Sequence, residues 1–101
     1  MKYRLTEAAK KDVQEIIRHI RDVQKSPQNA KLVAKRLKAQ FGKLTALPQL
    51  GHLRDELRDE NARVIAVTGL LVIYDPMLKP LTILRVIHGG RDLRRISPRE
   101  D

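Results

Sequence analysis

The chain lacks cysteine and tryptophan, and its other aromatic residues are few. Without cysteine it can form neither disulfides nor thiolate zinc sites, and this composition suits a reducing compartment. The three aromatic residues are Tyr3, Phe41 and Tyr74. They are too few to form a platform on which the bases of a single strand could stack. We therefore expect a cytoplasmic protein that does not bind single-stranded nucleic acid by stacking.

Long apolar segments are also missing. The longest, Val64–Tyr74, is interrupted by Thr68 and Gly69 and is shorter than the ~20 residues of a membrane-spanning helix. The first residues are charged and contain no apolar stretch of the kind found in a secretory signal peptide. The sequence thus predicts no contact with a membrane.

Positive charge, by contrast, is abundant. Lysine and arginine total 21 against 12 acidic residues, for a net charge of +9. Residues 1–50 hold 12 basic and 4 acidic side chains, and residues 85–99 hold five arginines with Asp92 as their single acid. Such a field favours a nucleic acid or an acidic protein as partner. A charged face that serves only solubility is the alternative.

The length of 101 residues predicts one domain, residues 1–101, in which residues 92–101 form a basic tail. Thr6 is a good N-cap for a first helix, and an apolar stripe with helical spacing runs from Ala9 to Val23. Ser26 and Pro27 predict the start of a second helix, which Pro48 ends. These two helices should form a hairpin.

The rest of the chain has the pattern of strands. Residues 2–5 predict a short first strand and residues 48–62 a loop. Residues 63–67, 70–74 and 81–88 predict three further strands, and Gly89-Gly90 ends the last one. The predicted fold is therefore α+β, in the order β-α-α-β-β-β. It is a small antiparallel sheet with the N-terminal helical hairpin packed on one face, while the other face and the tail remain available to a partner.

The histidines offer little support for a metal or cofactor site. No pair has the HExxH spacing, and thiolate ligands are absent, so we expect neither metal nor cofactor. His19 borders the apolar stripe of the first helix, and His52 lies in the predicted loop. His88 is the one candidate for acid–base chemistry because it precedes Arg91, which could hold a phosphate. Its alternative role is a strand-end hydrogen bond to a loop.

Arg85 stands out because it interrupts an apolar strand, where an unpaired guanidinium would be costly to desolvate. The first interpretation is an ion pair with Asp55 or Glu56 from the preceding loop. The second is an arginine that faces phosphate in a groove. We expect Asp55, Glu56 and Arg58 to form structural ion pairs.

Several segments together resemble the RelE/ParE toxin superfamily, and the ParE-like toxins most. The resemblance covers about residues 2–93, and it depends on the order and spacing of motifs that are weak one by one. They are Tyr3-Arg4-Leu5-Thr6, Leu47-Pro48-x-x-Gly51, Arg54-Asp55-Glu56-Leu57-Arg58, Leu70–Tyr74 and, most specifically, Ile83-Leu84-Arg85-Val86-Ile87-His88-Gly89-Gly90-Arg91-Asp92.

This resemblance implies the toxin of a bacterial type II toxin–antitoxin pair, neutralised by the C-terminal segment of a small antitoxin in a hetero-oligomer. ParE-like toxins are associated with inhibition of DNA gyrase, and RelE-like toxins cleave mRNA on the ribosome. The sequence departs from the nuclease pattern, because no tyrosine follows the last strand and residues 51–74 contain no lysine. We therefore favour gyrase inhibition by binding. A RelE-like nuclease remains the alternative, with Arg63, Arg85, His88 and Arg91 as its catalytic set.

The predicted target-binding surface is the last strand and the tail, with Arg85, His88, Arg91, Arg94 and Arg95. The antitoxin segment is expected to be acidic and amphipathic, to cover apolar sheet surface and to pair with the basic helices. A third hypothesis is a sequence-independent nucleic-acid-binding domain that uses the lysine faces of the helices.

Overall fold

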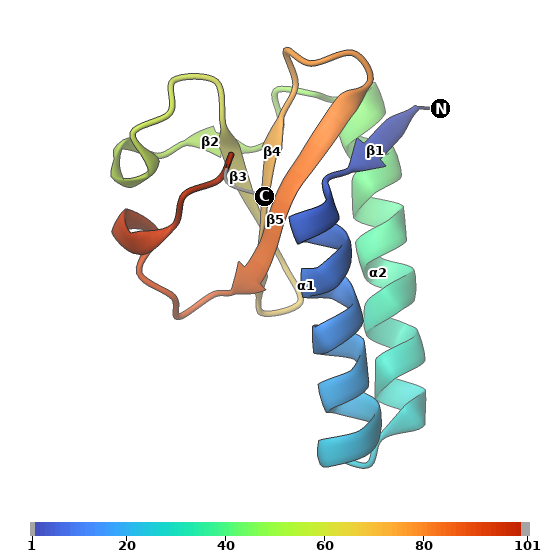
Figure 1. Ribbon diagram of the computed structural model, residues 1–101. Coiled ribbons are helices and arrows are strands. Elements are labelled where there is room, and N and C mark those ends of the chain that lie inside the picture. Colours follow the sequence, from blue (N-terminus) through green and yellow to red (C-terminus); the bar gives the residue numbers. More distant parts are fainter. Residues whose placement is uncertain (1, 100–101) are drawn as a thin grey trace.

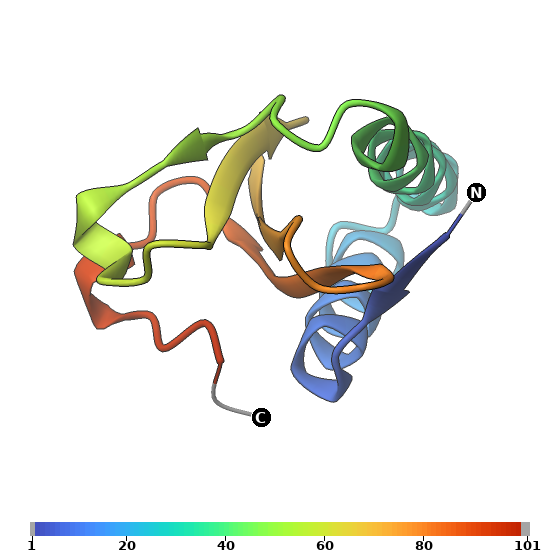
Figure 2. The same ribbon diagram turned by 90° about the horizontal axis from the view of Figure 1, so that it is seen from above.

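The computed structural model describes residues 2–99, which form three layers: a helical hairpin, a five-stranded sheet and a layer of irregular chain (Figures 1 and 2). The hairpin consists of α1 (Glu7–Arg18), a π-helical turn (His19–Val23) and α2 (Pro27–Ala46). The strands are β1 (Tyr3–Leu5), β2 (His52–Leu53), β3 (Arg63–Val67), β4 (Leu70–Asp75) and β5 (Leu81–His88). Two single turns of 3₁₀ helix span Asp55–Leu57 and Leu93–Arg95.

Both helices begin at the predicted caps. The hydroxyl of Thr6 accepts a hydrogen bond from the amide of Ala9 at 3.0 Å and donates one to the carbonyl of Leu84 at 2.8 Å. It therefore fixes the start of α1 against the sheet. The hydroxyl of Ser26 accepts from the amide of Asn29 at 3.3 Å, and Pro27 opens α2, where its missing N–H costs nothing.

The sheet has the order β1-β5-β4-β3-β2 and is mixed. The α+β class and the hairpin of helices are confirmed, but the prediction of a wholly antiparallel sheet is wrong, since β1 pairs with β5 in parallel. β1 and β5 lie 78 positions apart in the sequence, so no local turn between them reveals their relative direction. The hairpin of β3 and β4 and the bounds of β5 follow the prediction. The predicted loop 48–62 is not wholly irregular, because it contains β2 and a 3₁₀ turn.

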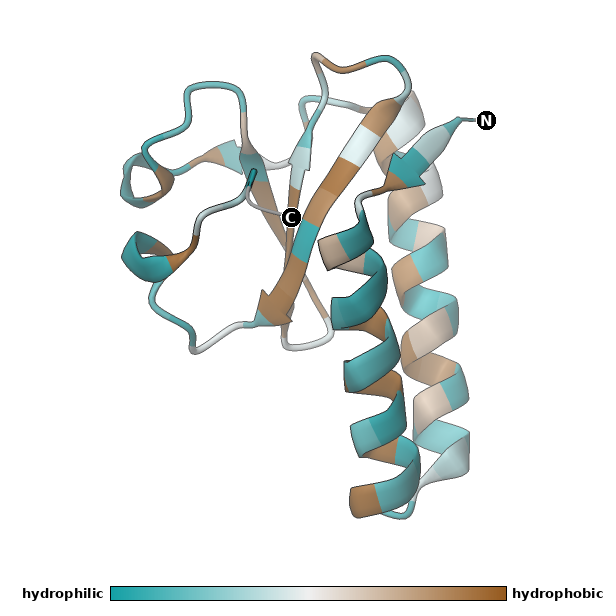
Figure 3. Cartoon of the chain, in the orientation of Figure 1, coloured by the Kyte–Doolittle hydropathy of each residue, from teal (hydrophilic) through white to brown (hydrophobic). Residues whose placement is uncertain are grey.

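One hydrophobic core lies between the sheet and the helices. It joins the apolar stripes of both helices to alternate residues of β4 and β5, and Tyr3 contacts Phe41 edge-to-face at 5.5 Å. Figure 3 shows β5 as hydrophobic along most of its length. Its most deeply buried large side chains are Leu37, Leu44, Val72, Tyr74, Ile83 and Val86.

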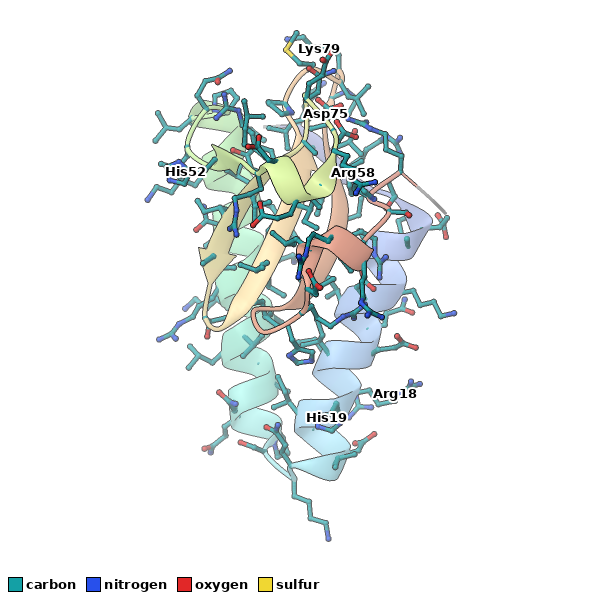
Figure 4. All side chains as sticks on the ribbon, turned by 90° about the vertical axis from the view of Figure 1, so that its left-hand side faces the viewer. Arg18, His19, His52, Arg58, Asp75 and Lys79 are labelled. Carbon is teal, nitrogen blue, oxygen red and sulfur yellow. The ribbon has the colours of Figure 1, made fainter. Side chains whose placement is uncertain are left out.

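A second core lies on the opposite face of the sheet, and it corrects the prediction that this face is free. Residues of the loop and of the C-terminal segment pack there against β3, β4 and β5. The members are Leu57, Ala62, Val64, Ile73, Leu84, Ile87, Leu93 and Ile96. Figure 4, which looks onto this face, shows the two 3₁₀ turns lying across the strands. The chain itself therefore covers the surface that we expected a partner to cover.

Arg99 holds the end of this second layer. Its guanidinium donates to both carboxylate oxygens of Asp59, at 2.6 and 3.0 Å, and to Asp75 at 2.6 Å. Asp75 is buried on β4, and its other oxygen accepts from the amide of Met77 at 2.8 Å. The basic tail is thus a folded strap as far as Arg99. Within residues 2–99 no helix is both long and apolar enough to cross a membrane.

Candidate functional site

Arg85 is held by α1 and not by the loop. Its Nε and Nη2 donate to the two carboxylate oxygens of Asp12 at 2.7 and 2.9 Å, and the amide of Val86 donates to the same carboxylate at 3.0 Å. The expected pair with Asp55 or Glu56 is therefore wrong. Asp12 closes the edge of β5 beyond the point where β1 ends, and this bidentate geometry explains an arginine in an apolar strand. The carboxylate of Asp12 offsets most of the charge of Arg85, so this arginine serves to position α1 against β5.

His88 ends β5 at the turn between β3 and β4. It pairs in register with Leu70, and the amide of the following Gly89 donates to the carbonyl of Gly69 at 3.0 Å. A Cβ on Gly89 would lie 3.1 Å from that carbonyl oxygen, so a larger residue would push the two turns apart. The turn thereby directs the chain away from the sheet immediately after His88, whose side chain is exposed.

A shallow hollow of about 240 Å³ lies where α1 meets the end of β5. Its charged and titratable lining combines Asp12, Glu15 and His19 from the hairpin with His88 and Arg91. An adjoining hollow of about 180 Å³ shares His19 and His88 and reaches the β3–β4 turn. Figure 4 shows His19 and Arg18 on the part of the hairpin that extends beyond the strands.

Arg94 and Arg95 project from a firmly seated turn. The carboxylate of Asp92 accepts from the backbone amide of Arg94 at 3.0 Å and from its guanidinium at 3.1 Å. Leu93 and Ile96 are buried beneath, whereas the side chains of Arg94 and Arg95 remain 72% and 86% exposed. The Arg94 guanidinium holds the pKa of Asp92 below its ordinary value. The apolar anchors thus present two exposed guanidinium groups, which share the single carboxylate of Asp92.

Arg91 lies between these features. It lines the hollow beside α1 and also a hollow of about 380 Å³ that Arg54, Asp92 and Arg94 border. We name His88, Arg91, Arg94 and Arg95 the C-terminal corner. His88, Arg91 and Arg94 line these two neighbouring hollows, and Arg95 follows Arg94 on the same turn. The guanidinium of Arg85 is paired with Asp12, which lines the first hollow.

Arg63 lies at the other end of the sheet. It pairs in register with Tyr74, whereas His88 pairs with Leu70, and four residues of strand correspond to roughly 13 Å. Its guanidinium donates to the carbonyl of Gly51 at 2.7 Å. The predicted nuclease set of Arg63, Arg85, His88 and Arg91 is therefore not assembled.

Tyr74 and Gly51 explain what Arg63 does. The hydroxyl of Tyr74 accepts from the amide of Gly51 at 2.7 Å and donates to the carbonyl of Pro48 at 2.8 Å. A Cβ on Gly51 would lie 2.8 Å from the Tyr74 ring and hydroxyl, so glycine is needed there. Burial raises the pKa of Tyr74, which keeps the hydroxyl a hydrogen-bond donor. Arg63 helps to close this loop and contributes to stability.

The loop residues expected to form ion pairs behave differently from one another. Glu56 pairs with Arg54 at 3.2 Å, and this contact lowers the pKa of Glu56. Asp55 and Arg58 meet through their backbones, since the amide of Arg58 donates to the carbonyl of Asp55 at 3.0 Å. Within residues 2–99 neither of their side chains forms an ion pair. The prediction for these two side chains is wrong because the 3₁₀ turn positions them by backbone geometry.

Acidic and histidine side chains do not gather into a metal site in the described part of the chain: residues 2–99 hold no group of three or more with suitable geometry. Glu15, His19 and His88 line one hollow, but they do not converge on a point. The polar chemistry on offer at the C-terminal corner is therefore a set of guanidinium groups beside an exposed imidazole.

Comparison with known families decides the relationship. A family model described as the ParE toxin of the type II toxin–antitoxin system parDE matches residues 3–93. The chain belongs to the ParE toxin family. No curated protein sequence matches it closely. A solved structure described as a chromosomal ParDE toxin–antitoxin system from P. aeruginosa superposes with a TM-score of 0.72 at 20% identity, covering 87% of this chain and 95% of that one. At this identity the likeness shows a common fold.

The ParE match ends at Leu93, the first residue of the second 3₁₀ turn. Arg94, Arg95 and the Arg99 anchor therefore lie beyond it. The ParE-like core thus includes the helical hairpin, all five strands, His88 and Arg91. Residues 94–99 of the strap, which include Ile96 and Arg99, lie outside the matched range.

Two sets of contacts were not predicted from the sequence. The first involves Asp12, whose carboxylate accepts from the amide of Val86 on β5. Asp12 precedes the buried Ile16 by four residues, and this spacing, which puts the two on one side of α1, could have indicated that Asp12 faces the sheet. Asp59 and Asp75 are joined only through Arg99, across sequence separations of 40 and 24. No local pattern encodes such a contact, since each partner is an ordinary surface charge when considered alone.

Proposed function

We propose that this ParE-family chain is a toxin that inhibits DNA gyrase by binding it through the C-terminal corner, and that a cognate antitoxin neutralises it. The supporting observation is the corner itself, in which Arg91, Arg94 and Arg95 are exposed on a turn fixed by Leu93 and Ile96. Preorganised guanidinium groups bind carboxylates and phosphates with little further loss of conformational entropy. A gyrase target implies action in the cytoplasm.

Binding rather than catalysis is favoured by what surrounds the corner. Phosphodiester cleavage needs a positioned acid and base together with cations that stabilise the transition state. Of the nuclease set, Arg63 is engaged with Gly51 and Arg85 with Asp12, which leaves His88 and Arg91. One exposed histidine and one arginine are a weak basis for a nuclease, so mRNA cleavage is retained as an outcome of the test.

The antitoxin contact is proposed for the open edge of β3. Among the described strands, β2 pairs with β3 at Arg63 and Val64, so Ile65–Val67 offer an unpaired edge to an added strand. Asn29 lines the hollow at the β3–β4 turn, and Arg36 and Lys43 follow it at seven-residue intervals on the same flank of α2. These cations suit an acidic antitoxin segment lying beside that edge.

The gyrase proposal is tested with the purified full-length chain in a supercoiling assay. Arg91→Gln, Arg94→Gln and Arg95→Gln are combined in one corner variant. The control variant removes the same charge elsewhere, at the exposed residues Lys2, Lys11 and Lys79. We expect the corner variant to need at least about tenfold more protein for half inhibition, the effect of losing hot-spot contacts. The control should remain within about twofold of the parent.

The same proteins are then added to translating ribosomes, and the mRNA is examined for cleavage. Intact mRNA together with inhibited gyrase supports the proposal. Cleaved mRNA with unaffected gyrase overturns it, and the His88→Ala variant then identifies the acid or base. Equal loss of gyrase inhibition in the corner and control variants also overturns it, because net charge alone would then account for the effect.

A further inference from the structure

The two helices of the hairpin use their charges differently. On and beside α1, Lys10 pairs with Glu7, Arg21 with Asp22 and Arg85 with Asp12. Residues 23–54 contain no acidic residue, and α2 carries five basic ones: Lys31, Lys35, Arg36, Lys38 and Lys43. None of these five forms an ion pair within residues 2–99. The fold therefore leaves the charge of α2 available to a partner.

Three of these lysines form one ridge. Lys31, Lys35 and Lys38 have the spacing i, i+4, i+7, which aligns them along the helix over roughly 10 Å. All three are exposed, and they point away from the buried stripe of Ala30, Val33, Leu37, Phe41 and Leu44. We name these three residues the lysine ridge. Arg36 and Lys43 lie on a different flank of the helix, toward β3, so the ridge is separate from the proposed antitoxin edge.

The position of the ridge suits a large partner. In Figure 1 the half of the hairpin that contains the start of α2 extends past the end of the sheet, and no other segment covers its outer side. Extended, rigid partners can approach such a surface without meeting the strands. The C-terminal corner lies on the far side of α1 from this face, since its hollow is lined by Asp12, Glu15 and His19.

The chemistry of the ridge favours phosphate over an amphipathic peptide. Phe41 is the one aromatic residue of α2 and is buried, so the ridge offers no ring on which unpaired bases could stack. The large apolar side chain exposed on α2 is Leu32, at 42%, which gives an amphipathic segment a poor anchor. A row of ammonium groups on flexible stems is instead suited to phosphates along a duplex backbone.

We propose that the lysine ridge of α2 binds the phosphate backbone of double-stranded nucleic acid without reading its sequence. This activity goes beyond gyrase inhibition and uses a different surface. The ridge would hold the toxin on a duplex while the corner and the β3 edge remain available to protein partners. The strength of this contact falls steeply with salt, because each ammonium–phosphate contact releases counterions.

The test measures binding of the full-length chain to a fluorescent 24-base-pair DNA duplex by anisotropy, from 50 to 200 mM salt. The ridge variant combines Lys31→Gln, Lys35→Gln and Lys38→Gln, which preserve helix propensity. The variant with Lys2, Lys11 and Lys79 changed to glutamine is the control of equal charge. Circular dichroism and gyrase inhibition, which the ridge does not serve, verify that each variant is folded.

We expect the ridge variant to bind at least about tenfold more weakly at 100 mM salt, with the slope of log K against log salt reduced by about 2.7. The control should lose less than about threefold. An RNA duplex of equal length identifies which duplex is preferred, and binding of either one through the ridge supports the proposal. Equal losses in ridge and control variants would overturn it, as would tight binding of a poly-glutamate peptide with no binding of either duplex.

Failure of this proposal is distinguishable from failure of the gyrase proposal. A ridge variant that loses duplex binding but inhibits gyrase normally separates the two surfaces. A ridge variant that keeps full duplex affinity refutes the ridge and leaves the corner untouched.

Discussion

The two faces of the sheet are covered by different kinds of structure. On one face, α1 and α2 bury apolar stripes that recur with helical spacing. On the other, a loop and the C-terminal strap bury Leu57, Leu93 and Ile96 without any regular period. Regular elements satisfy their own backbone hydrogen bonds and need only an apolar face. An irregular layer must be held by individual anchors, and here Arg99 joins it to Asp59 and Asp75.

This difference predicts unequal stability. The helical layer has continuous internal hydrogen bonds and a larger core, so it should open only on global unfolding. The strap has one 3₁₀ turn and a few side-chain contacts, which is the profile of a segment that opens locally first. The four predictions that follow test this contrast, beginning with the largest expected effect.

The largest effect is expected on the helical face. Leu37 is 1% exposed in the first core, and Leu37→Ala removes buried carbon and leaves a cavity. We expect the free energy of unfolding to fall by about 3 kcal/mol, measured by urea denaturation. The loss should appear as a single cooperative transition. A local loss confined to α2 in hydrogen exchange would contradict the view that this layer unfolds with the whole domain.

The next effect concerns the strap. Arg99→Gln leaves Asp75, which is 2% exposed, without its cationic partner. We expect a cost of about 2 kcal/mol, since a buried carboxylate that loses its partner is expensive. Hydrogen exchange should accelerate at residues 93–99 before it does in α2. Matched exchange in the two segments would show that the strap and the helices form one cooperative unit.

A smaller effect is expected from pH. The guanidinium of Arg99 lowers the pKa of Asp59 below the ordinary value of about 3.9. A carboxyl group with a depressed folded-state pKa contributes stability that is complete above the unfolded pKa and is lost as pH falls through the folded one. We therefore expect the strap to lose on the order of 1 kcal/mol below about pH 4. Asp59→Asn should flatten this dependence in pH-resolved denaturation, and Asp92→Asn, which removes an exposed pair, should not.

The smallest effect on stability is expected at the corner. The side chains of Arg94 and Arg95 are largely exposed, so Arg94→Gln with Arg95→Gln should change the free energy of unfolding by less than about 0.5 kcal/mol. The same variant should still lose gyrase inhibition. A destabilisation above about 1 kcal/mol in thermal melting would indicate that these residues support the strap rather than a partner.

The local elements were predictable from the sequence, and the site was predictable only in part. Thr6, Ser26 and Pro27 are local signals, and each begins a helix where predicted. The β3–β4 hairpin and β5 follow from β-branched runs and turn residues. His88, Arg91 and Arg94 line neighbouring hollows and Arg95 follows on the same turn, as expected of residues near one another in the chain, and their role in target binding stays a prediction. The alternative nuclease set placed Arg63 with Arg85, His88 and Arg91, but strand order and register put Arg63 at the other end of the sheet from His88.

The sequence by itself determined the helices, their caps and the hairpin of strands, since each depends on residues that are near one another in the chain. It also determined the excess of positive charge, which is a property of composition alone. Only the tertiary structure decided that Arg85 pairs with Asp12, that β1 runs parallel to β5 and that Arg99 fastens the strap between two carboxylates. These contacts join residues 24 to 78 positions apart. A charged side chain carries no local mark of its partner, so its role is set by whichever opposite charge the packed elements bring within reach.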